Sequence, residues 1–346
     1  MRQYRETGNG ARRLDILPGE TTTWEQAVGE WAVARADALA LDPTRIRARY
    51  RWNPGGLVNA SFGLSDGQRR LHVKLAPAAS EPALRRWITV ADRLASEYHA
   101  PALVRIETGG PVEGTALTVV MEAVGGSSLG LVDAGEHLFA IAAAMERLHD
   151  DGVLSGMLAD APRDCAAVFR STYQRRWRED LEQTRPHLSD LSWVSPADWA
   201  WCEGEVNRLS MLPDAFAAPA DAVTHGDLHW DNLLVEGPEW HVLDWDDISG
   251  AGDPALDDAL LWEPLLRAGD PDGLAAAHLR HLPAKRRTRA EFYMRATLLD
   301  DAVDVLADAA AALEYDEEIR RLTWSRAETL HERALRLYRA RYPAEP

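Results

Sequence analysis

The chain has 346 residues, 46% of them hydrophobic and 27% charged, so it is long enough to build two lobes with separate apolar cores. Its formal net charge of −17 argues against non-specific binding of nucleic acid, which requires a basic surface to neutralise phosphates. No secretory signal or membrane-spanning apolar run of roughly 20 residues is visible, and the two cysteines lack metal-ligand spacing. We therefore expect a cytoplasmic protein with neither a membrane nor a nucleic-acid partner.

Residues 1–44 are predicted to form an extension, a polar leader followed by one helix. Thr23 to Gln26 fits a capping box, in which the first and fourth residues satisfy each other's backbone at a helix start. Trp24, Val28 and Trp31 then repeat at helical spacing, and the helix is expected to stop before Pro43.

Residues 45–123 alternate between apolar and polar side chains, which is typical of strands, and one helix interrupts them. Turn signals at 53–56 and 65–68 separate the first three strands. This pattern predicts a small antiparallel sheet that holds one helix. The predicted strands are residues 46–52, 57–64, 71–75, 102–107 and 115–123, and the predicted helix is 82–98.

Residues 124–346 are predicted to be mainly helical, with one β-like island at 223–246. Helices are expected at 135–149, from Pro196 onward, at 288–313 and at 316–341. The fold class is therefore predicted to be α+β, with a small antiparallel β lobe followed by a mainly helical lobe.

The β-like island carries the densest polar chemistry of the chain. A polar loop and a short apolar strand lead through a turn at Glu236-Gly237-Pro238 into a second apolar strand that ends in acid. Such a hairpin places Asp227, Asn232 and Asp244 near one another at one end. A carboxylate and an amide oxygen suit Mg²⁺, and a second carboxylate can orient an attacking hydroxyl and take its proton. These are the parts that a phosphoryl transfer requires.

Other chemistries fit the same residues less well. His225 and His229 lie four apart, as in a helical zinc pair, but the His-Glu-x-x-His order is missing and the segment is predicted to be a loop. A purely structural hairpin would not concentrate so many acids above apolar strands. The phosphate-cradling Gly-x-x-x-x-Gly-Lys-Ser/Thr loop does not occur either, which excludes the NTPases that depend on it.

The spacing of this segment resembles the signature of the aminoglycoside phosphotransferase family, the small-molecule branch of the protein-kinase-like fold. The matching residues are His225-Gly226-Asp227 with Asn232, then Asp244-Trp245, then Gly252-Asp253-Pro254 with Asp257. The resemblance covers roughly residues 45–262 and implies a two-lobe kinase-like fold, with a nucleotide-binding lobe at 45–123 and a helical lobe at 124–346. It implies that Asp227 is the catalytic carboxylate and that Asn232 and Asp244 hold Mg²⁺. By the same resemblance, His225, Asp253 and Asp257 brace the loop.

A lysine in the first lobe completes the expected catalytic set. Only Lys74 and Lys285 are lysines among 38 basic residues, so a lysine that remains is expected where arginine cannot serve. Lys74 lies on an apolar strand, where a charge is costly unless it is used, and it resembles the phosphate-holding lysine of the kinase fold. Its usual partner is a glutamate on the next helix. Glu81 is the favoured candidate, ahead of Glu97 and the shorter Asp92.

Two further segments are expected to bind the nucleotide. Gly55 and Gly56 at a strand turn would let backbone N–H groups approach phosphates, because glycine has no Cβ to block them. Residues 119–126 resemble the family's hinge, which would assign the carbonyl of Glu122 and the N–H of Val124 to adenine. An ordinary hairpin turn and an edge strand are the structural alternatives for these two segments.

The sequence thus predicts an ATP-dependent O-phosphotransferase, with ATP (GTP as the alternative) and Mg²⁺ as cofactors and a hydroxyl-bearing small molecule as its partner. A cationic antibiotic or related natural product ranks first, with a role in antibiotic resistance. A metabolic sugar or amino-alcohol kinase ranks second, and a catalytically silent kinase-like binding module is the alternative of another class. Asp246, Asp247, Asp258 and Glu263 are candidates to receive ammonium groups. The aromatic stripe of Phe169, Tyr173 and Trp177 is predicted to be core.

Overall fold

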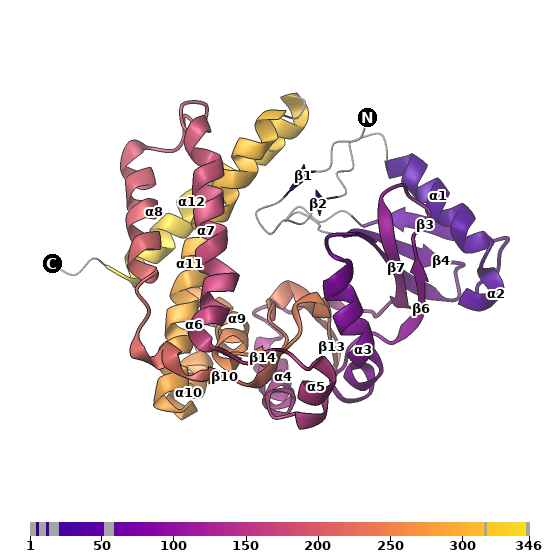
Figure 1. Ribbon diagram of the computed structural model, residues 1–346, viewed down its shortest axis with the longest axis horizontal. Coiled ribbons are helices and arrows are strands. Elements are labelled where there is room, and N and C mark those ends of the chain that lie inside the picture. Colours follow the sequence, from indigo (N-terminus) through magenta and orange to yellow (C-terminus); the bar gives the residue numbers. More distant parts are fainter. Residues whose placement is uncertain (1–4, 7–11, 14–20, 52–58, 315–316, 344–346) are drawn as a thin grey trace. The chain divides into compact units, whose positions relative to one another are not determined.

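The computed structural model describes residues 5–6, 12–13, 21–51, 59–314 and 317–343 (Figure 1). The chain forms two compact units, each of two segments: Met1–Ala159 with His225–Ser249, and Asp160–Thr224 with Gly250–Pro346. Among the described residues, no helix combines the length and the hydrophobicity that crossing a membrane requires. The predicted lobe boundaries at residues 45 and 124 stay a prediction.

A five-stranded antiparallel sheet is the centre of the first unit. Its strand order is β3-β4-β5-β7-β6, so β7 lies between the consecutive strands β5 and β6. On β5 the side chains of Leu71, Val73 and Leu75 are buried, whereas His72 and Lys74 point to the other face, as the two-residue period of a strand requires. The strands are β3 (Arg47–Tyr50), β4 (Ala60–Ser65), β5 (Arg70–Pro77), β6 (Leu103–Thr108) and β7 (Thr115–Glu122).

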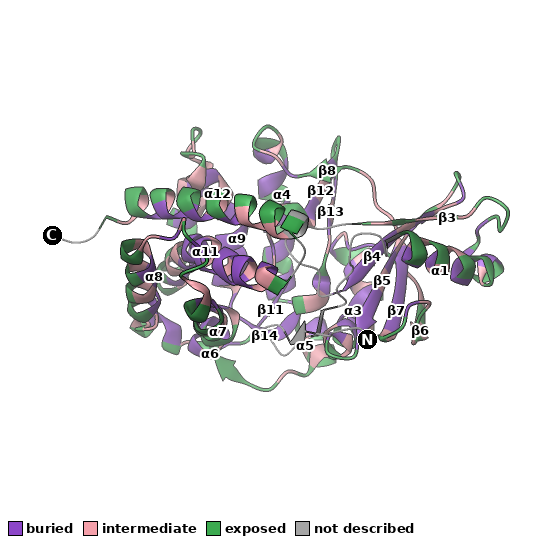
Figure 2. Cartoon of the chain, turned by 90° about the horizontal axis from the view of Figure 1, so that it is seen from above, coloured by how far each residue is buried: buried purple, intermediate pink, exposed green. Residues whose placement is uncertain are grey.

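Two N-terminal helices cover one face of this sheet. Helices α1 (Thr21–Val33) and α2 (Ala36–Leu39) contribute Trp24, Val28 and Leu39 to a core that includes Phe62 and Val73 of the strands. Figure 2 shows the buried residues along β4, β5 and β7. The predicted helix before Pro43 is therefore present, and it serves the sheet. Short strands β1 (Arg5–Glu6) and β2 (Arg12–Arg13) pair with each other ahead of it.

Three α-helices and a second small sheet make up most of the remaining described part of the first unit. The helices are α3 (Glu81–Glu97), α4 (Ala134–His149) and α5 (Gly152–Leu158). The sheet has the order β13-β12-β8, from β8 (Ser127–Ser128), β12 (Leu233–Glu236) and β13 (Glu239–Val242). Strands β12 and β13 form the predicted hairpin, with Leu233 opposite Val242 and a left-handed Gly237 in its turn.

The second unit is mainly helical. Its long helices α11 (Ala284–Ala311) and α12 (Glu317–Arg341) pack on each other, and α11 also contacts α7, α8 and α9. The other helices are α6 (Cys165–Phe169), α7 (Arg175–Thr184), α8 (Pro196–Leu209), α9 (Pro254–Arg267) and α10 (Leu274–His281). Two strand pairs, β9 (Arg163–Asp164) with β10 (Pro219–Ala220) and β11 (Ala222–Thr224) with β14 (Ser249–Gly252), complete the chain.

The aromatic stripe is core, as predicted. A π-helical turn at Arg170–Gln174 joins α6 to α7, and Phe169, Tyr173 and Trp177 are all buried. Their rings pack on one another and on Phe216 and Tyr293, with centroids 5.4–6.1 Å apart in edge or tilted geometry. The sheet-rich first part and the mainly helical remainder confirm the predicted fold class.

Candidate active site

The loop before β12 brings Asp227 and Asn232 together. A 3₁₀ turn at Trp230–Asn232 directs the Asn232 amide back along the chain, where its Nδ2 donates to the backbone oxygen of Asp227 at 2.8 Å and to its carboxylate at 2.9 Å. The Asp227 side chain is still 39% exposed, so a carboxylate oxygen is accessible from solvent. An acid that is held in place and accessible in this way can accept a proton from an incoming hydroxyl.

His225 connects this loop to the end of the hairpin. It is fully buried, and its Nδ1 accepts from the backbone N–H of Asp227 at 3.1 Å. Its Nε2 must therefore carry the proton that it donates to the backbone oxygen of Leu243 at 2.8 Å. The imidazole thus ties Asp227 to the residue before Asp244. Gly226, between His225 and Asp227 in the sequence, has a φ of +86°. A Cβ there would meet the Asp247 backbone oxygen at 2.7 Å, so only glycine fits.

Asp244 ends the hairpin in a rare conformation. Its φ of 57° and ψ of 59° are left-handed, which is uncommon for a residue with a side chain. The backbone N–H of Leu243 donates to Asn232 at 2.8 Å, and the indole of Trp245 donates to Val242 at 2.8 Å. Bonds on both sides of Asp244 hold the turn, and the structure brings Asp227, Asn232 and Asp244 to one end of the hairpin, where they were expected.

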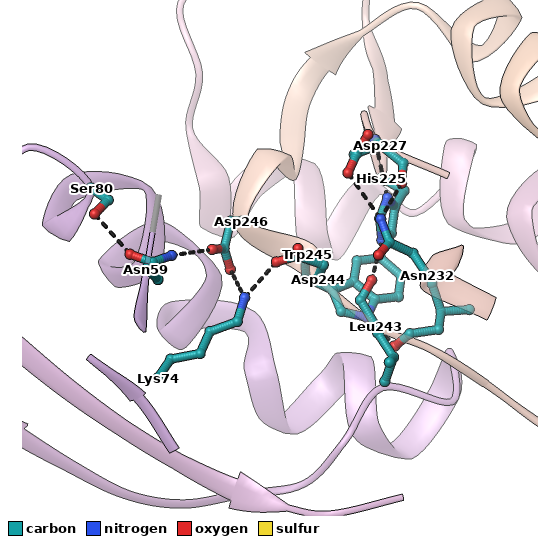
Figure 3. A network of polar contacts seen from close by, with 11 residues as sticks. Asn59, Lys74, Ser80, His225, Asp227, Asn232, Leu243, Asp244, Trp245 and Asp246 are labelled. Atoms are coloured by element: carbon teal, nitrogen blue, oxygen red, sulfur yellow. Dashed lines mark hydrogen bonds and ion pairs between the residues drawn. The ribbon is translucent and has the colours of Figure 1, made fainter. Parts of the chain in front are cut away.

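Lys74 reaches this end from β5 and contacts two carboxylates. Its ammonium forms an ion pair with Asp244 and a second with Asp246 at 3.0 Å (Figure 3). The prediction that Glu81 is the partner of Lys74 is wrong. Glu81 lies in the first turn of α3 and pairs with Arg85 at 2.7 Å, four residues along the same helix. Position i+4 is within reach of a helix side chain, and Arg85 occupies it.

Asp246 belongs to a chain of hydrogen-bonded side chains that was not predicted from the sequence. The second carboxylate oxygen of Asp246 accepts from Asn59 Nδ2 at 2.9 Å, and the Asn59 amide oxygen accepts from Ser80 Oγ at 2.8 Å. Asp246 was expected to receive an ammonium group of a substrate, but the ammonium it receives is that of Lys74. The signal for this chain in the sequence was the pair of polar residues Asn59 and Ser80, which flank the antiparallel strands β4 and β5 and so meet at the open end of that hairpin.

The charges at this end shift one another's protonation. Burial opposes the charged form of Lys74, yet Asp244 and Asp246 outweigh it and raise the lysine pKa. Desolvation likewise would raise the pKa of Asp244, but the charge and hydrogen bond of Lys74 lower it overall. Burial, with the nearby Asp244, raises the pKa of Asp246 to about 6 against the opposing effect of Lys74. Burial and the positive Lys74 lower the pKa of His72 to about 4, so this imidazole is neutral at pH 7.

These side chains line one end of a cavity of about 600 Å³ in the first unit. Residues 122–126 and the apolar residues Trp87, Met121 and Leu234 form other parts of its wall. Glu122 uses its backbone N–H on Ala102 at 2.9 Å and its carboxylate on Arg69. A Cβ on Gly126 would meet the backbone oxygen of Val235 at 2.5 Å, so the two segments approach closely only because this residue is glycine.

The donor set at the hairpin fits Mg²⁺. The Asn232 amide nitrogen faces Asp227, so the amide oxygen is what Asn232 offers to the cavity that it lines with Asp244. Two oxygen donors suit a hard cation that keeps phosphates and waters in its other positions. In the described part of the chain, no group of three or more His, Cys, Asp or Glu side chains is arranged so that it could hold a metal ion. The predicted phosphate turn at Gly55 and Gly56 lies outside the described residues.

The remaining motif residues lie in the second unit and stabilise it. Gly252 is in such close contact with Thr224 that a Cβ would meet its hydroxyl at 1.9 Å. Asp253 caps α9 through the N–H of Ala255 and forms a buried ion pair with Arg289 at 2.8 Å. Two acids proposed for a substrate ammonium already have partners: Glu263 is paired with Arg267, and Asp258 with Arg286.

The model of the phosphotransferase enzyme family matches residues 50–293, well over half of the chain. The chain belongs to the phosphotransferase enzyme family. This confirms the resemblance that the motif spacing indicated, and with it the enzyme class, a small-molecule kinase. No curated protein matches the chain in sequence.

Solved structures show the same fold at low sequence identity. A microcompartment-associated aminopropanol kinase is 17% identical, with 90% of this chain and 97% of that chain covered and a TM-score of 0.64. A spectinomycin phosphotransferase in complex with ADP and spectinomycin is 12% identical, with 89% and 98% covered and a TM-score of 0.55. A choline kinase from Cryptosporidium parvum Iowa II is 12% identical, with 89% and 96% covered and a TM-score of 0.51. The same fold therefore occurs in proteins that are named for different substrates.

Proposed function

We propose that the chain is an ATP-dependent O-phosphotransferase that transfers a phosphoryl group to a hydroxyl of a cationic small molecule. The observation that carries this proposal is the convergence of Asp227, Asn232, Asp244 and Lys74 at one end of the hairpin. Each supplies one part of a phosphoryl transfer from ATP with Mg²⁺ to an acceptor hydroxyl.

In this proposal Asp227 acts on the acceptor. Its carboxylate orients the hydroxyl and takes the proton as the acceptor oxygen bonds to the γ-phosphorus and the bond to the ADP oxygen breaks. Asn232 holds Asp227 from one side through two hydrogen bonds, and His225 fixes the backbone from the other. A carboxylate placed in advance loses little freedom in the transition state.

The nucleotide is assigned to the 600 Å³ cavity. The backbone of Glu122 and Val124 would bind adenine there, and Lys74 would bind phosphate oxygens as a compact positive charge. Asn232 and Asp244 would hold Mg²⁺, which when bound neutralises phosphate charge. Relatives of this fold crystallised with ADP or GDP lend support to a nucleotide at the corresponding place, with ATP preferred and GTP as the alternative.

A cationic acceptor is favoured by the charge of the chain as a whole, which is −17. A negative surface attracts a cationic ligand and raises its local concentration. Antibiotics with amino groups and small amino alcohols both fit this chemistry. The antibiotic ranks first, and a metabolic amino alcohol second because aminopropanol and choline kinases share the fold.

A coupled assay of ADP release tests the proposal. Amino-sugar, peptide and nucleoside antibiotics are screened beside amino alcohols and neutral sugars. The Asp227→Asn variant is assayed separately with every compound as a control. We expect one cationic class to stimulate ADP release, and Asp227→Asn to lower kcat by about 10²–10⁴-fold while nucleotide affinity is retained. Activity in Asp227→Asn above about a tenth of the normal rate would remove Asp227 from the proton-accepting role.

A further inference from the structure

The two carboxylates that neutralise Lys74 are not equivalent. The side chain of Asp244 is 45% exposed, and its one ion pair among the described residues is the one with Lys74. The Asp246 side chain is 20% exposed, and its two oxygens have separate partners, Lys74 and Asn59. Asp246 is thus fixed on both sides, whereas Asp244 is held mainly through its backbone turn.

The fixed position of Asp246 depends on an amide whose two ends are both used. Asn59 Nδ2 donates to Asp246, and Asn59 Oδ1 accepts from Ser80 Oγ, so the amide cannot rotate without breaking one of these bonds. Asn59 and Ser80 are each only 7% exposed. Buried polar groups that satisfy one another in this way form rigid networks, because an unpaired member would be costly.

We propose that Asp246, oriented by Asn59 and Ser80, is the positioning residue for Lys74, in the role that a helix glutamate fills in protein kinases. This inference rests on the proposed function of Lys74 as the phosphate-binding lysine. Ser80 precedes α3 directly, so the chain from Ser80 through Asn59 and Asp246 couples the start of α3 to the lysine. Asp244 is then left to the metal, and Lys74 keeps one carboxylate when a nucleotide with Mg²⁺ is bound.

The geometry also explains why no glutamate on α3 is required. Glu81 is paired with Arg85, and the next acid of the helix, Asp92, has a shorter side chain. The acid two residues beyond the metal aspartate replaces it from another segment. A carboxylate at 3.0 Å removes much of the conformational freedom of the long lysine side chain. Removing this carboxylate should therefore lower the affinity for the nucleotide more than the affinity for the acceptor.

The scarcity of lysine makes Lys74 directly observable. With ¹³Cε-lysine incorporated in the full chain, the spectrum contains two lysine Cε signals, from Lys74 and Lys285. The variants are Asp246→Asn and Asn59→Ala, with Glu81→Gln as the matched control, since it removes an acid from α3 without touching the Lys74 network. Each is examined at one fixed pH for the Lys74 signal and for the Kd of a non-hydrolysable ATP analogue at saturating Mg²⁺.

We expect Asp246→Asn to shift the Lys74 signal, to leave the Lys285 signal in place and to raise the analogue Kd about tenfold, equivalent to about 1.4 kcal/mol. Asn59→Ala should shift the same signal by less, and Asp246→Glu should restore part of the affinity. The effects of Asn59→Ala and Asp246→Asn should not add in the double variant, because both act through one contact.

Three results would overturn the inference. These are an unchanged Lys74 signal and Kd in Asp246→Asn, a Glu81→Gln effect as large as that of Asp246→Asn, and a binding defect that disappears as Mg²⁺ is raised, which would make Asp246 a metal ligand. If Asp246→Asn does not fold, Asn59→Ala carries the comparison. The signal and the Kd need no acceptor, so a chain that passes here but phosphorylates nothing would refute the proposed function alone.

Discussion

At the scale of single residues, Lys74 combines a position on an apolar strand with a charge between two carboxylates. Its side chain is 12% exposed, and its neighbours across the strands are Ser61 and Val119. A compact ammonium fits this narrow site, whereas the planar guanidinium of arginine needs more room and a different arrangement of acceptors.

Lys74→Arg is therefore expected to reduce kcat/KM by at least about tenfold although the charge is kept. Steady-state kinetics with ATP and the best acceptor measure this. Lys285→Arg is the matched control, because it is the same change at the only other lysine of the sequence and is expected to be silent. Equal rates in the two variants would contradict the assignment of Lys74.

The assignment of Asn232 and Asp244 as Mg²⁺ ligands leads to a separate prediction. Asn232→Ala and Asp244→Ala should each move the Mg²⁺ dependence of nucleotide affinity to higher concentration, since each removes an oxygen donor. Isothermal titration calorimetry over a series of Mg²⁺ concentrations measures the nucleotide affinity of each variant. Asp231 of the same loop is exposed, so Asp231→Asn serves as the control. Superimposable curves for both alanine variants would show that the metal is bound elsewhere.

At the scale of elements, the interface between α7 and α11 places several acids together. Asp180 of α7 is 8% exposed, and its Oδ2 has no hydrogen-bond partner in the described residues. Burial, followed by the charges of Asp304 and Asp300, raises its pKa to about 8, and Arg176 opposes the shift. The helix pair thus carries an acid that stays protonated at neutral pH.

This acid should make the stability of the second unit depend on pH. The unfolded chain releases the Asp180 proton near pH 4, while the folded chain keeps it until about pH 8, so the free energy of unfolding falls as pH rises through this window. Asp180→Asn removes this loss. We expect it to stabilise the protein by roughly 1–3 kcal/mol at pH 8 and by much less at pH 5. Urea unfolding at both pH values measures it, and an equal effect at the two would refute the elevated pKa.

At the scale of the whole molecule, the net charge of −17 attracts cations and repels polyanions. An exposed attraction is screened over about 8–10 Å at physiological ionic strength, whereas contacts inside a cavity are screened less. The acceptor and the nucleotide should therefore respond differently to salt.

The KM of a cationic acceptor is expected to rise several-fold when the salt concentration is raised from about 20 mM to about 300 mM, because the screening length becomes shorter. The KM of ATP should change less. Initial rates at fixed Mg²⁺ measure both, and a neutral analogue of the acceptor serves as the control. A neutral sugar as the best substrate, with a KM indifferent to salt, would defeat the cationic acceptor and favour the metabolic sugar kinase.

The fold class and the hairpin that carries the candidate site could be predicted from the sequence alone. The period of two on β5 placed Lys74 opposite the apolar core, and a loop, strand, turn and strand placed Asp227, Asn232 and Asp244 at one end. Both patterns are local, because strand alternation and hairpin register depend on residues close in sequence.

The acid that neutralises Lys74 could be identified only from the three-dimensional structure. Asp246 is 172 residues away, and nothing in the local pattern distinguishes it from Glu81, which sits at a plausible helix position but is taken by Arg85. The same holds for Asp258, whose partner Arg286 comes from another helix, whereas the pairing of Glu263 with Arg267 four residues along α9 is local. Charge pairing between distant segments depends on the packing of the backbone, and spacing along the chain does not encode it.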